Sequence, residues 1–294
     1  MPENWINGDV PFWKMNGSGN DFIVVDNRTV QIPEDYIATW AKRVCRRRES
    51  IGADGVVMID GLEADSPSGV AFRWRYFNAD GSEGEMCGNG AMCGARFAID
   101  ERIAPNPCSF TTMSGVVEAS LTSDSMGSMV SLSIPDTGPM TPEFSIEVRG
   151  TSIACRSVNV GVPHTVVVVD DADAWPDDGE FEAWGLAIRQ HSNFAPSGAN
   201  VNIVSQTTDG RLRMRTYERG VESETLACGT GAVASALVAT EIGLMLSPVH
   251  VATSGGRNLV VDFLIENSCA TSVRLIGTAS VVAKGQMRPD DVQW

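Results

Sequence analysis

Two cysteines of this chain stand in nearly the same surroundings, about half a chain apart. Cys87 begins the run CGNGA within GEMCGNGAMCGARFAI, and Cys228 begins the run CGTGA within ETLACGTGAVASALVA. The small and apolar residues after each run are typical of a helix that is buried on most sides. The free N–H groups and the dipole at the first turn of a helix stabilise a thiolate. Each thiol is therefore a candidate for acid–base, nucleophilic or redox chemistry.

The pair of sites indicates more than either site alone. Glycines beside each cysteine let a ligand approach the backbone, and the free N–H groups can bind a carboxylate. If the two helix starts face each other, the two thiols flank one ligand. This suits proton transfer at the α-carbon of an amino acid, because inversion needs a base on one face and an acid on the other. The sequence has no evident PLP-binding lysine and no cluster of metal ligands, so we expect chemistry without a cofactor or metal.

Two further pairs of segments repeat in the same order. FNADGSEGEM from Phe77 and YERGVESETLA from Tyr217 each precede one of the cysteines. GNDFIVVDN from Gly19 and GVPHTVVVVDD from Gly161 each lie further upstream, at similar distances from their cysteine. Self-similarity at a fixed separation is the sequence signature of a repeated structural unit. The chain is therefore predicted to form two related lobes.

The rest of the chain supplies the elements of those lobes. Many short runs of alternating or β-branched residues between Gly, Pro and Asp predict strands. Residues 36–48, 88–102 and 229–242 predict helices, so we expect an α+β fold of two pseudo-symmetric lobes. The expected boundaries follow the linker-like passage PDTGPMTPE: an N-terminal lobe over residues 1–134 that the strand within 277–294 completes, a linker over 135–142, and a C-terminal lobe over 143–276.

Composition limits the classes of partner. The 294 residues are 43% hydrophobic and 20% charged, as in soluble globular proteins. No apolar run is long enough to cross a bilayer, and the N-terminus does not resemble a signal peptide. A net charge of −15 disfavours nucleic-acid binding, and the basic cluster from Lys42 to Arg48 is interpreted as a solvated helix face. We expect a cytoplasmic protein with reduced thiols that binds a small molecule, neither nucleic acid nor membrane.

Six blocks of the sequence together resemble the diaminopimelate epimerase family. They are KMNGSGNDFIVVDN, FNADGSEGEMCGNGA, VGVPHTVVVVDD, ANVNIV, YERGVESETLACGTGA and GTASVVAKG, and their order and spacing cover nearly the whole chain. The resemblance implies two mixed β-barrels, each around a central helix. It also implies cofactor-independent interconversion of LL- and meso-diaminopimelate for lysine and peptidoglycan precursors, and a homodimer, which is frequent among family members.

The resemblance also implies roles for individual residues. Cys87 and Cys228 match the acid–base pair, His164 matches the partner of one thiol, and Glu218 matches the partner of the other. Arg219 is suited to a bidentate grip on the distal carboxylate. The residues that match the grip on the reacting carboxylate are Gly88, Asn89, Gly229 and Thr230, and those that match the remaining substrate contacts are Asn20, Asn78, Asn200, Glu218 and Arg219.

The chain departs from the family pattern at one substrate-binding position. Many members have Gly-Asn-Pro-His where this chain has Gly161-Val162-Pro163-His164. The Asn of that motif helps to bind the distal end of the substrate, and a valine side chain cannot form a hydrogen bond. Asn159 lies nearby and is the candidate to compensate. The departure leaves open a racemase of another amino acid, such as a histidine-type racemase, with the same two thiols.

Two functions of other classes remain as alternatives to an epimerase. Two thiols that share one site could instead form a reversible Cys87–Cys228 disulfide in a redox enzyme. The chain could also be a non-catalytic binding module, which the retention of both thiols, Glu218 and His164 argues against. Buried structural roles are expected of the remaining cysteines, Cys45, Cys93, Cys108, Cys155 and Cys269, as is usual for free cysteines.

Overall fold

The computed structural model describes residues 8–124, 127–135, 137–266 and 269–288. The chain divides into two compact units, one formed by residues up to 132 together with those from 277 onward, the other by residues 133–276. Both units mix helices and strands, so the expected α+β class is confirmed. None of the helices in the described ranges is long and apolar enough to span a membrane.

The strands of the first unit form a mixed sheet, in which each strand pairs with the next. In pairing order they are β17 (Cys269–Met287), β1 (Val10–Gly17), β2 (Asn20–Asp26), β3 (Gly55–Asp60), β4 (Phe72–Asn78), β6 (Cys108–Thr112), β7 (Gly115–Asp124) and β8 (Gly127–Ser133). The pairs β2–β3 and β4–β6 are parallel and the other pairs in this series are antiparallel. The short β5 (Glu83–Gly84) pairs with β4. A further pairing of β8 with β17 closes the series.

The second unit repeats this succession of strands. In pairing order they are β10 (Thr151–Asn159), β11 (Pro163–Val168), β12 (Asn200–Gln206), β13 (Leu212–Glu218), β15 (Val249–Ala252), β16 (Asn258–Glu266) and the first part of β17. The pairs β11–β12 and β13–β15 are parallel, at the places that β2–β3 and β4–β6 occupy in the first unit. The short β14 (Ser223–Thr225) pairs with β13, as β5 pairs with β4. The edge strand β9 (Phe144–Val148) pairs with β10.

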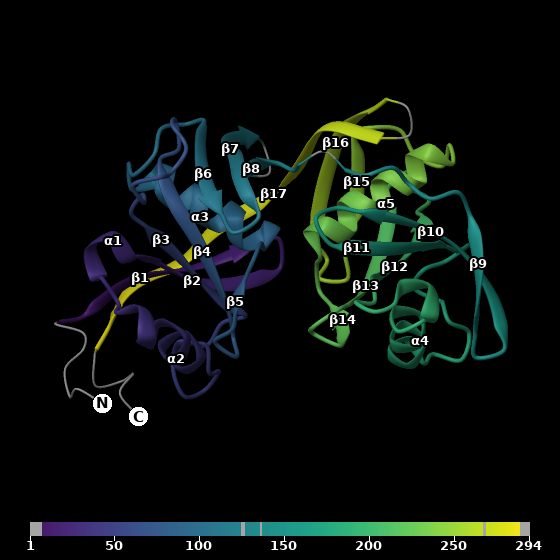
Figure 1. The fold of residues 1–294 in the computed structure, drawn as a ribbon, viewed down its shortest axis with the longest axis horizontal. Helices are drawn as coiled ribbons and strands as arrows, with labels where there is room; N and C mark the ends of the chain where they lie inside the picture. Colours follow the sequence, from purple (N-terminus) through teal and green to yellow (C-terminus); the bar gives the residue numbers. More distant parts are fainter. Residues whose placement is uncertain (1–7, 125–126, 136, 267–268, 289–294) are drawn as a thin grey trace. The chain divides into compact units, whose positions relative to one another are not determined.

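One helix lies at the centre of each unit. Figure 1 shows α3 (Gly88–Asp100) surrounded by strands of the first unit and α5 (Gly229–Glu241) surrounded by strands of the second. Small residues make this possible, because they let the strands approach the helix backbone. At Gly94 an added Cβ would lie 2.6 Å from the Trp74 ring. In α5 the run from Ala232 to Ala239 is buried throughout.

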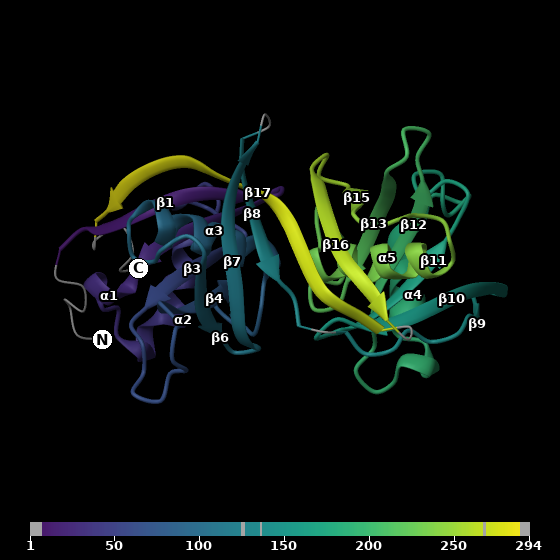
Figure 2. The ribbon, with the colours of Figure 1, turned by 90° about the horizontal axis from the view of Figure 1, so that it is seen from above.

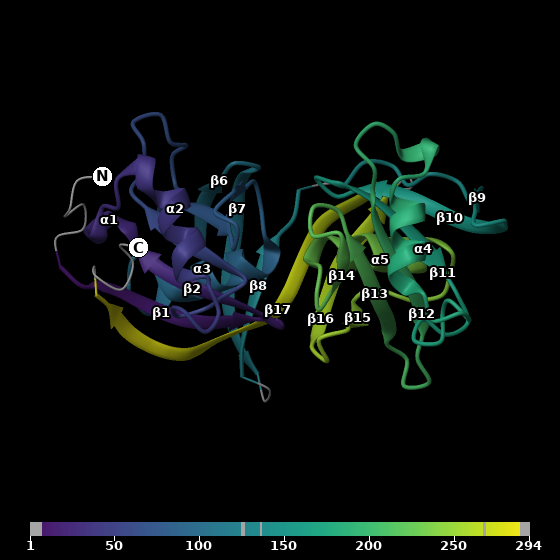
Figure 3. The same cartoon turned by 90° about the horizontal axis from the view of Figure 1, so that it is seen from below.

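A second helix packs on the outside of each unit. In the chain it connects the two strands of a parallel pair, β2 and β3 in the first unit and β11 and β12 in the second. In the first unit, α2 (Glu34–Val44) packs Ile37, Trp40 and Val44 against β2 and β3. In the second, α4 (Phe181–Arg189) packs Phe181 and Ile188 against β11 and β12. Figure 3 shows both outer helices. The short helices are α1 (Asn27–Val30) and η1 (Ser192–Phe194).

The helix expected over residues 36–48 is shorter than predicted, because the chain turns back after Val44. Gly52 N–H donates to the Val44 carbonyl at 2.9 Å, and Arg48 adopts a φ of 74°. The interpretation of this basic cluster as a helix face is therefore wrong for Arg46, Arg47 and Arg48, which are exposed but lie beyond the helix. The Arg47 guanidinium forms an ion pair with Asp21.

Two segments connect the units. The strand β17 pairs with β16 up to Ile276 and with β1 from Ala279 onward (Figure 2). The segment expected as a linker hydrogen-bonds within the second unit: Thr137 N–H donates to Ala270 on β17 at 3.4 Å, and Thr141 N–H donates to Ser157 on β10 at 2.9 Å. The described part of this segment therefore belongs to the second unit.

Candidate active site

The first cysteine of the repeat is the N-cap of the central helix of its unit. Cys87 has an extended backbone, with φ −140° and ψ 109°, and its carbonyl accepts the first helical hydrogen bond from Ala91 at 2.7 Å. The Cys87 Sγ accepts a hydrogen bond from Gly90 N–H at 3.4 Å. The sulfur is therefore held at the first turn of α3, where backbone N–H groups favour the thiolate.

A chain of side-chain hydrogen bonds leads away from this helix start. The buried Asn89 donates from Nδ2 to Asn20 Oδ1 at 2.7 Å, and Asn20 donates from Nδ2 to Asp54 Oδ2 at 3.1 Å. The other oxygen of Asp54 accepts from Arg47 at 2.8 Å. The Asn89 Oδ1 is buried and has no hydrogen-bond partner in the described part of the chain. This oxygen is an acceptor that a ligand with an N–H group would satisfy.

Asn78, the other predicted contact in this unit, lies at the end of β4. Its Nδ2 donates to the Ser82 hydroxyl at 3.0 Å and to the Ser82 carbonyl at 3.3 Å, and its own carbonyl accepts from Gly81 N–H. The side chain thereby closes the turn between β4 and β5. An added Cβ at Gly84 would lie 3.6 Å from Asn78 Nδ2, so the amide is packed against this short strand.

The second cysteine occupies the equivalent place in its own unit. Cys228 is the N-cap of α5, with φ −125° and ψ 113°, and its carbonyl accepts from Ala232 at 2.9 Å. Only 6% of its surface is exposed. Its Sγ lies 3.6 Å from the Thr230 hydroxyl. Gly229 and Thr230 therefore form the first turn behind this thiol, as Gly88 and Asn89 do behind Cys87.

His164 lies on β11 and is fully buried among amides. Its Nδ1 is 3.0 Å from Asn202 Nδ2, and its Nε2 is 3.5 Å from Asn200 Nδ2. Burial, and to a lesser extent the positive charge of Arg219, lowers the pKa of His164 to about 3. The ring is therefore neutral at ordinary pH.

Asn200, Glu218 and Arg219 lie together where β12 begins and β13 ends. The Asn200 Oδ1 accepts from the backbone N–H of Arg219 at 2.8 Å, which fixes the start of the turn. Burial raises the pKa of Glu218, and the nearby Thr225 hydroxyl opposes that rise. Glu218 is therefore protonated more readily than an exposed carboxyl, as suits a group that exchanges a proton.

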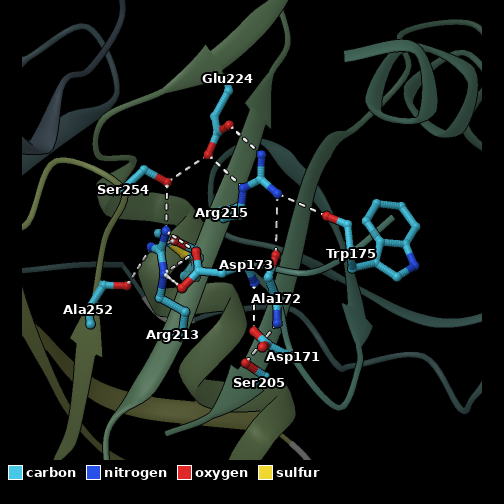
Figure 4. A network of polar contacts seen from close by, with 11 residues as sticks. Asp171, Ala172, Asp173, Trp175, Ser205, Arg213, Arg215, Glu224, Ala252 and Ser254 are labelled. Carbon is cyan, nitrogen blue, oxygen red and sulfur yellow. Dashed lines mark hydrogen bonds and ion pairs between the residues drawn. The ribbon is translucent and has the colours of Figure 1, made fainter. Parts of the chain in front are cut away.

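An ion-pair network that the sequence analysis did not identify supports this turn. Figure 4 shows Glu224 on β14 between Arg215 and Ser254. It accepts two hydrogen bonds from the Arg215 guanidinium, at 2.9 and 2.7 Å, and one from Ser254 at 2.7 Å. Arg213, which lies on β13 like Arg215, forms an ion pair with Asp173. The network ties the hairpin β13–β14 to its neighbours, and the alternating arginines of RLRMRTY are the signal that could have indicated it.

The remaining cysteines have no comparable surroundings. All seven cysteines are free thiols. Burial raises the pKa of Cys45 to about 12 and that of Cys108 to about 11, and it also raises the pKa values of Cys93 and Cys155. These four thiols are protonated at neutral pH and fill the core. Among the described residues, no group of three or more His, Cys, Asp or Glu side chains is placed to hold a metal ion.

Comparison with known proteins identifies the family. The family model "Diaminopimelate epimerase" matches residues 12–139 and 156–280. The unmatched residues between these ranges include β9 and the start of β10, at the edge of the second unit. The diaminopimelate epimerase of Aquifex aeolicus is 38% identical, over 96% of this chain and 99% of the relative. That of a Hydrogenobaculum species is 41% identical, over 93% of this chain and 97% of the relative.

The fold also has distant relatives among solved structures. A probable proline racemase from Agrobacterium radiobacter superposes with a TM-score of 0.71 at 15% identity, over 96% of this chain and 93% of that chain. At this identity the match shows a shared fold alone. The sequence matches over almost the full length carry the assignment: the chain belongs to the diaminopimelate epimerase family.

Proposed function

We propose that this protein interconverts LL- and meso-diaminopimelate by proton transfer at the α-carbon, with Cys87 and Cys228 as the two acid–base groups. One observation carries the proposal: in a chain of this family, each thiol is the N-cap of the buried central helix of its own unit. A nucleophilic cysteine needs one such site, whereas inversion needs two.

In the proposed reaction the two thiols act on opposite faces of the substrate's α-carbon. The thiolate of one cysteine removes the α-proton, the C–H bond breaks, and its electron pair moves toward the substrate carboxylate. The backbone N–H groups at the starts of α3 and α5 bind that carboxylate and stabilise its growing charge. The thiol of the other cysteine then delivers its proton to the opposite face. The thiol and thiolate have now exchanged roles, as the reverse reaction requires.

The groups around the thiols have distinct parts in this proposal. The neutral ring of His164 donates a hydrogen bond to a thiolate without itself taking the proton, because its pKa is about 3. Glu218, whose pKa is raised by burial, supports the other thiol as a hydrogen-bond partner that can gain or lose a proton. Asn89 provides an amide contact at the reacting carboxylate, and Asn20, Asn78 and Asn200 provide further contacts to the substrate.

The distal end of the substrate is less closely defined. Arg219 follows β13, and its guanidinium is suited to a bidentate contact with the distal carboxylate. Val162 lies half-buried in the turn before β11, and its carbonyl accepts from Val160 at 3.1 Å. Its side chain offers no hydrogen bond there, and Asn159 remains the predicted substitute. A second substrate, with an imidazole in place of the distal carboxylate, is the alternative that this valine favours.

We also propose a cytoplasmic homodimer. The homodimer is carried over from the family resemblance, and the location follows from the expected use of the product in lysine and peptidoglycan precursors. Gel filtration with light scattering tests the dimer directly, since a monomer mass at enzyme concentrations would contradict it.

The test of the proposed function is proton NMR in heavy water under reducing conditions. LL-diaminopimelate should lose its α-hydrogen signal and yield the meso isomer, and a panel that includes L-histidine measures specificity. Cys87→Ala and Cys228→Ala should each reduce inversion at least about 100-fold. If neither diaminopimelate nor another amino acid exchanges its α-hydrogen, the proposal is wrong. If one alanine variant retains full inversion, the two-thiol mechanism is wrong.

A further inference from the structure

The buried side-chain amide of Asn202, in the second unit, contacts His164 at Nδ1. Asn202, on β12, has no exposed surface. Its Oδ1 accepts from the Thr216 hydroxyl at 3.0 Å. Its Nδ2 lies 3.3 Å from the Thr165 carbonyl and 3.0 Å from His164 Nδ1. All polar atoms of this amide are therefore engaged by neighbours in the core.

The Thr165 carbonyl decides which way the amide points. A carbonyl oxygen can only accept, so the atom of Asn202 that faces it must be the NH₂ group. The reverse orientation would place two acceptors 3.3 Å apart in the core without a proton between them. The Thr216 hydroxyl can donate or accept and is compatible with this orientation. The NH₂ group of Asn202 therefore also faces His164 Nδ1.

The two contacts of the His164 ring then determine which of its tautomers is more stable. With the proton on Nε2, Nδ1 accepts from Asn202 at 3.0 Å, and two donors, the Nε2–H and the NH₂ group of Asn200, face each other only at the longer distance of 3.5 Å. With the proton on Nδ1, two donors would face each other at 3.0 Å, and the ring would gain only the longer contact of 3.5 Å from Asn200 to Nε2. Donor–acceptor distances near 3.0 Å are those of good hydrogen bonds, and 3.5 Å is at the limit. The arrangement thus favours the proton on Nε2.

The helix that carries the thiol keeps the amide in place. An added Cβ at Gly231 would lie 2.4 Å from Asn202 Oδ1 and 3.2 Å from Cys228 Sγ. Only a glycine lets the first turn of α5 pack against this amide. The glycine of the CGTGA run thus has a role beyond access for a ligand, because it leaves room for the amide that contacts His164.

We propose that Asn202 is a positioning residue, which fixes neutral His164 in the Nε2–H tautomer and so leaves this N–H as the donor toward the reacting groups. The inference rests on the proposed function for the use made of that donor, and on the geometry of the second unit alone for the tautomer itself. A wrong tautomer would present a lone pair where the reaction needs a donor.

The direct test is long-range proton–nitrogen NMR of protein with ¹⁵N-labelled histidine. The chain has 3 histidines, and the signals that vanish in His164→Gln belong to His164. We expect Nδ1 in the range of an unprotonated ring nitrogen and Nε2 in the range of a protonated one. The opposite pattern, or rapid averaging between the two tautomers, would overturn the proposal. This measurement needs no activity, so it is independent of whether diaminopimelate is the substrate.

Variants of the amide and its hydroxyl partner test the function of the tautomer. Asn202→Asp places an acceptor against Nδ1 and should draw the proton there, with kcat reduced roughly 10- to 100-fold and KM little changed. Asn193→Asp makes the same change in an exposed helix and should have no effect. An Asn202→Asp enzyme with the altered tautomer but full kcat would overturn the positioning role.

A second pair covers the case in which Asn202→Asp does not fold. Thr216→Val removes the hydroxyl that binds Asn202 Oδ1, and Thr216→Ser retains it. The valine variant should broaden or shift the His164 nitrogen signals and reduce kcat, and the serine variant should restore both. Equal behaviour of the two variants would contradict the proposal.

Discussion

The two helix starts share a backbone and a thiol but differ in what lies behind them. Behind Cys87, the hydrogen bonds run from Asn89 through Asn20 to Asp54 and end at the half-exposed Arg47. Behind Cys228, the hydrogen bonds run from Thr216 through Asn202 to His164, and all three of these residues are buried and uncharged. The two units thus repeat the backbone of the helix start, with a cysteine as N-cap, while the residues that support it differ.

This difference suits the proposed mechanism, in which one thiolate removes a proton and the other thiol delivers one. A charged network near the surface responds to salt and solvent, because exposed ion pairs are screened. A neutral buried network is insensitive to salt, but it disfavours protonation, because a buried charge without a partner is costly. In that mechanism the supporting residues, more than the thiols themselves, therefore distinguish the two acid–base groups.

The largest expected effect concerns acid stability, which should depend on the second unit through His164. Burial lowers the pKa of the His164 ring in the folded protein from 6.5 to about 3. The unfolded chain therefore gains this proton first as pH falls, so stability decreases below about pH 6.5. Between pH 6.5 and 4.5 the loss from this one group is roughly 2–3 kcal/mol. Denaturant unfolding at a series of pH values should show it as a slope that His164→Gln removes.

The matched control is His250→Gln, at an exposed position of the same unit. Its unfolding free energy should follow that of the wild type across the same pH range. A His164→Gln curve parallel to the wild-type curve would contradict the assignment of the acid sensitivity to the buried ring.

The next effect compares the equivalent third residues after each cysteine, Gly231 and Gly90. An added Cβ at Gly231 would meet Asn202 Oδ1 at 2.4 Å, whereas at Gly90 the nearest atom is a methyl carbon of Val57 at 3.3 Å. Gly231→Ala should therefore cost about 1–3 kcal/mol by overpacking. It should also reduce kcat, because the amide behind His164 must move.

Gly90→Ala should cost less than about 1 kcal/mol, because alanine is the better helix former by a similar amount. Thermal unfolding and steady-state kinetics of the two variants measure the difference. Similar losses in both would mean that the two helix starts are packed alike, and the asymmetry inferred from the supporting residues would fail at this position.

The residues that sequence analysis predicted are those whose surroundings in the chain are distinctive. Cys87 and Cys228 were found by the repeat, and the α+β fold of two units by the order of strands and helices; the structure places both thiols as predicted N-caps. Asp54 and Asn202 were not found, because each acts through partners that are distant in sequence. Asp54 contacts Asn20, 34 positions away, and Asn202 contacts His164, 38 positions away.

The end of α2 illustrates a second limit. Residues 45–48 continue a pattern compatible with a helix, but tertiary hydrogen bonds to residues 52 and 53 end it at Val44. Helix propensity is a weak preference that such contacts override. Because α2 ends early, Arg47 lies in the turn that follows and forms ion pairs with Asp21 and Asp54. The hydrogen-bond network behind Cys87 therefore depends on a turn that the local sequence did not indicate.

The smallest expected effect is in that exposed support. Arg47→Ala removes the ion pairs to Asp54 and Asp21, but the Arg47 side chain is 59% exposed, so the pairs should contribute no more than about 1 kcal/mol, or about fivefold in activity. Arg46→Ala, in an exposed pair with Glu49, is the control and should change neither rate nor salt dependence. Because salt screens the Arg47 pairs in the wild type, the activity difference between Arg47→Ala and wild type should shrink as ionic strength rises. A difference that persists at high salt would mean that Arg47 acts through packing, and the support behind Cys87 would then resemble the salt-insensitive one behind Cys228.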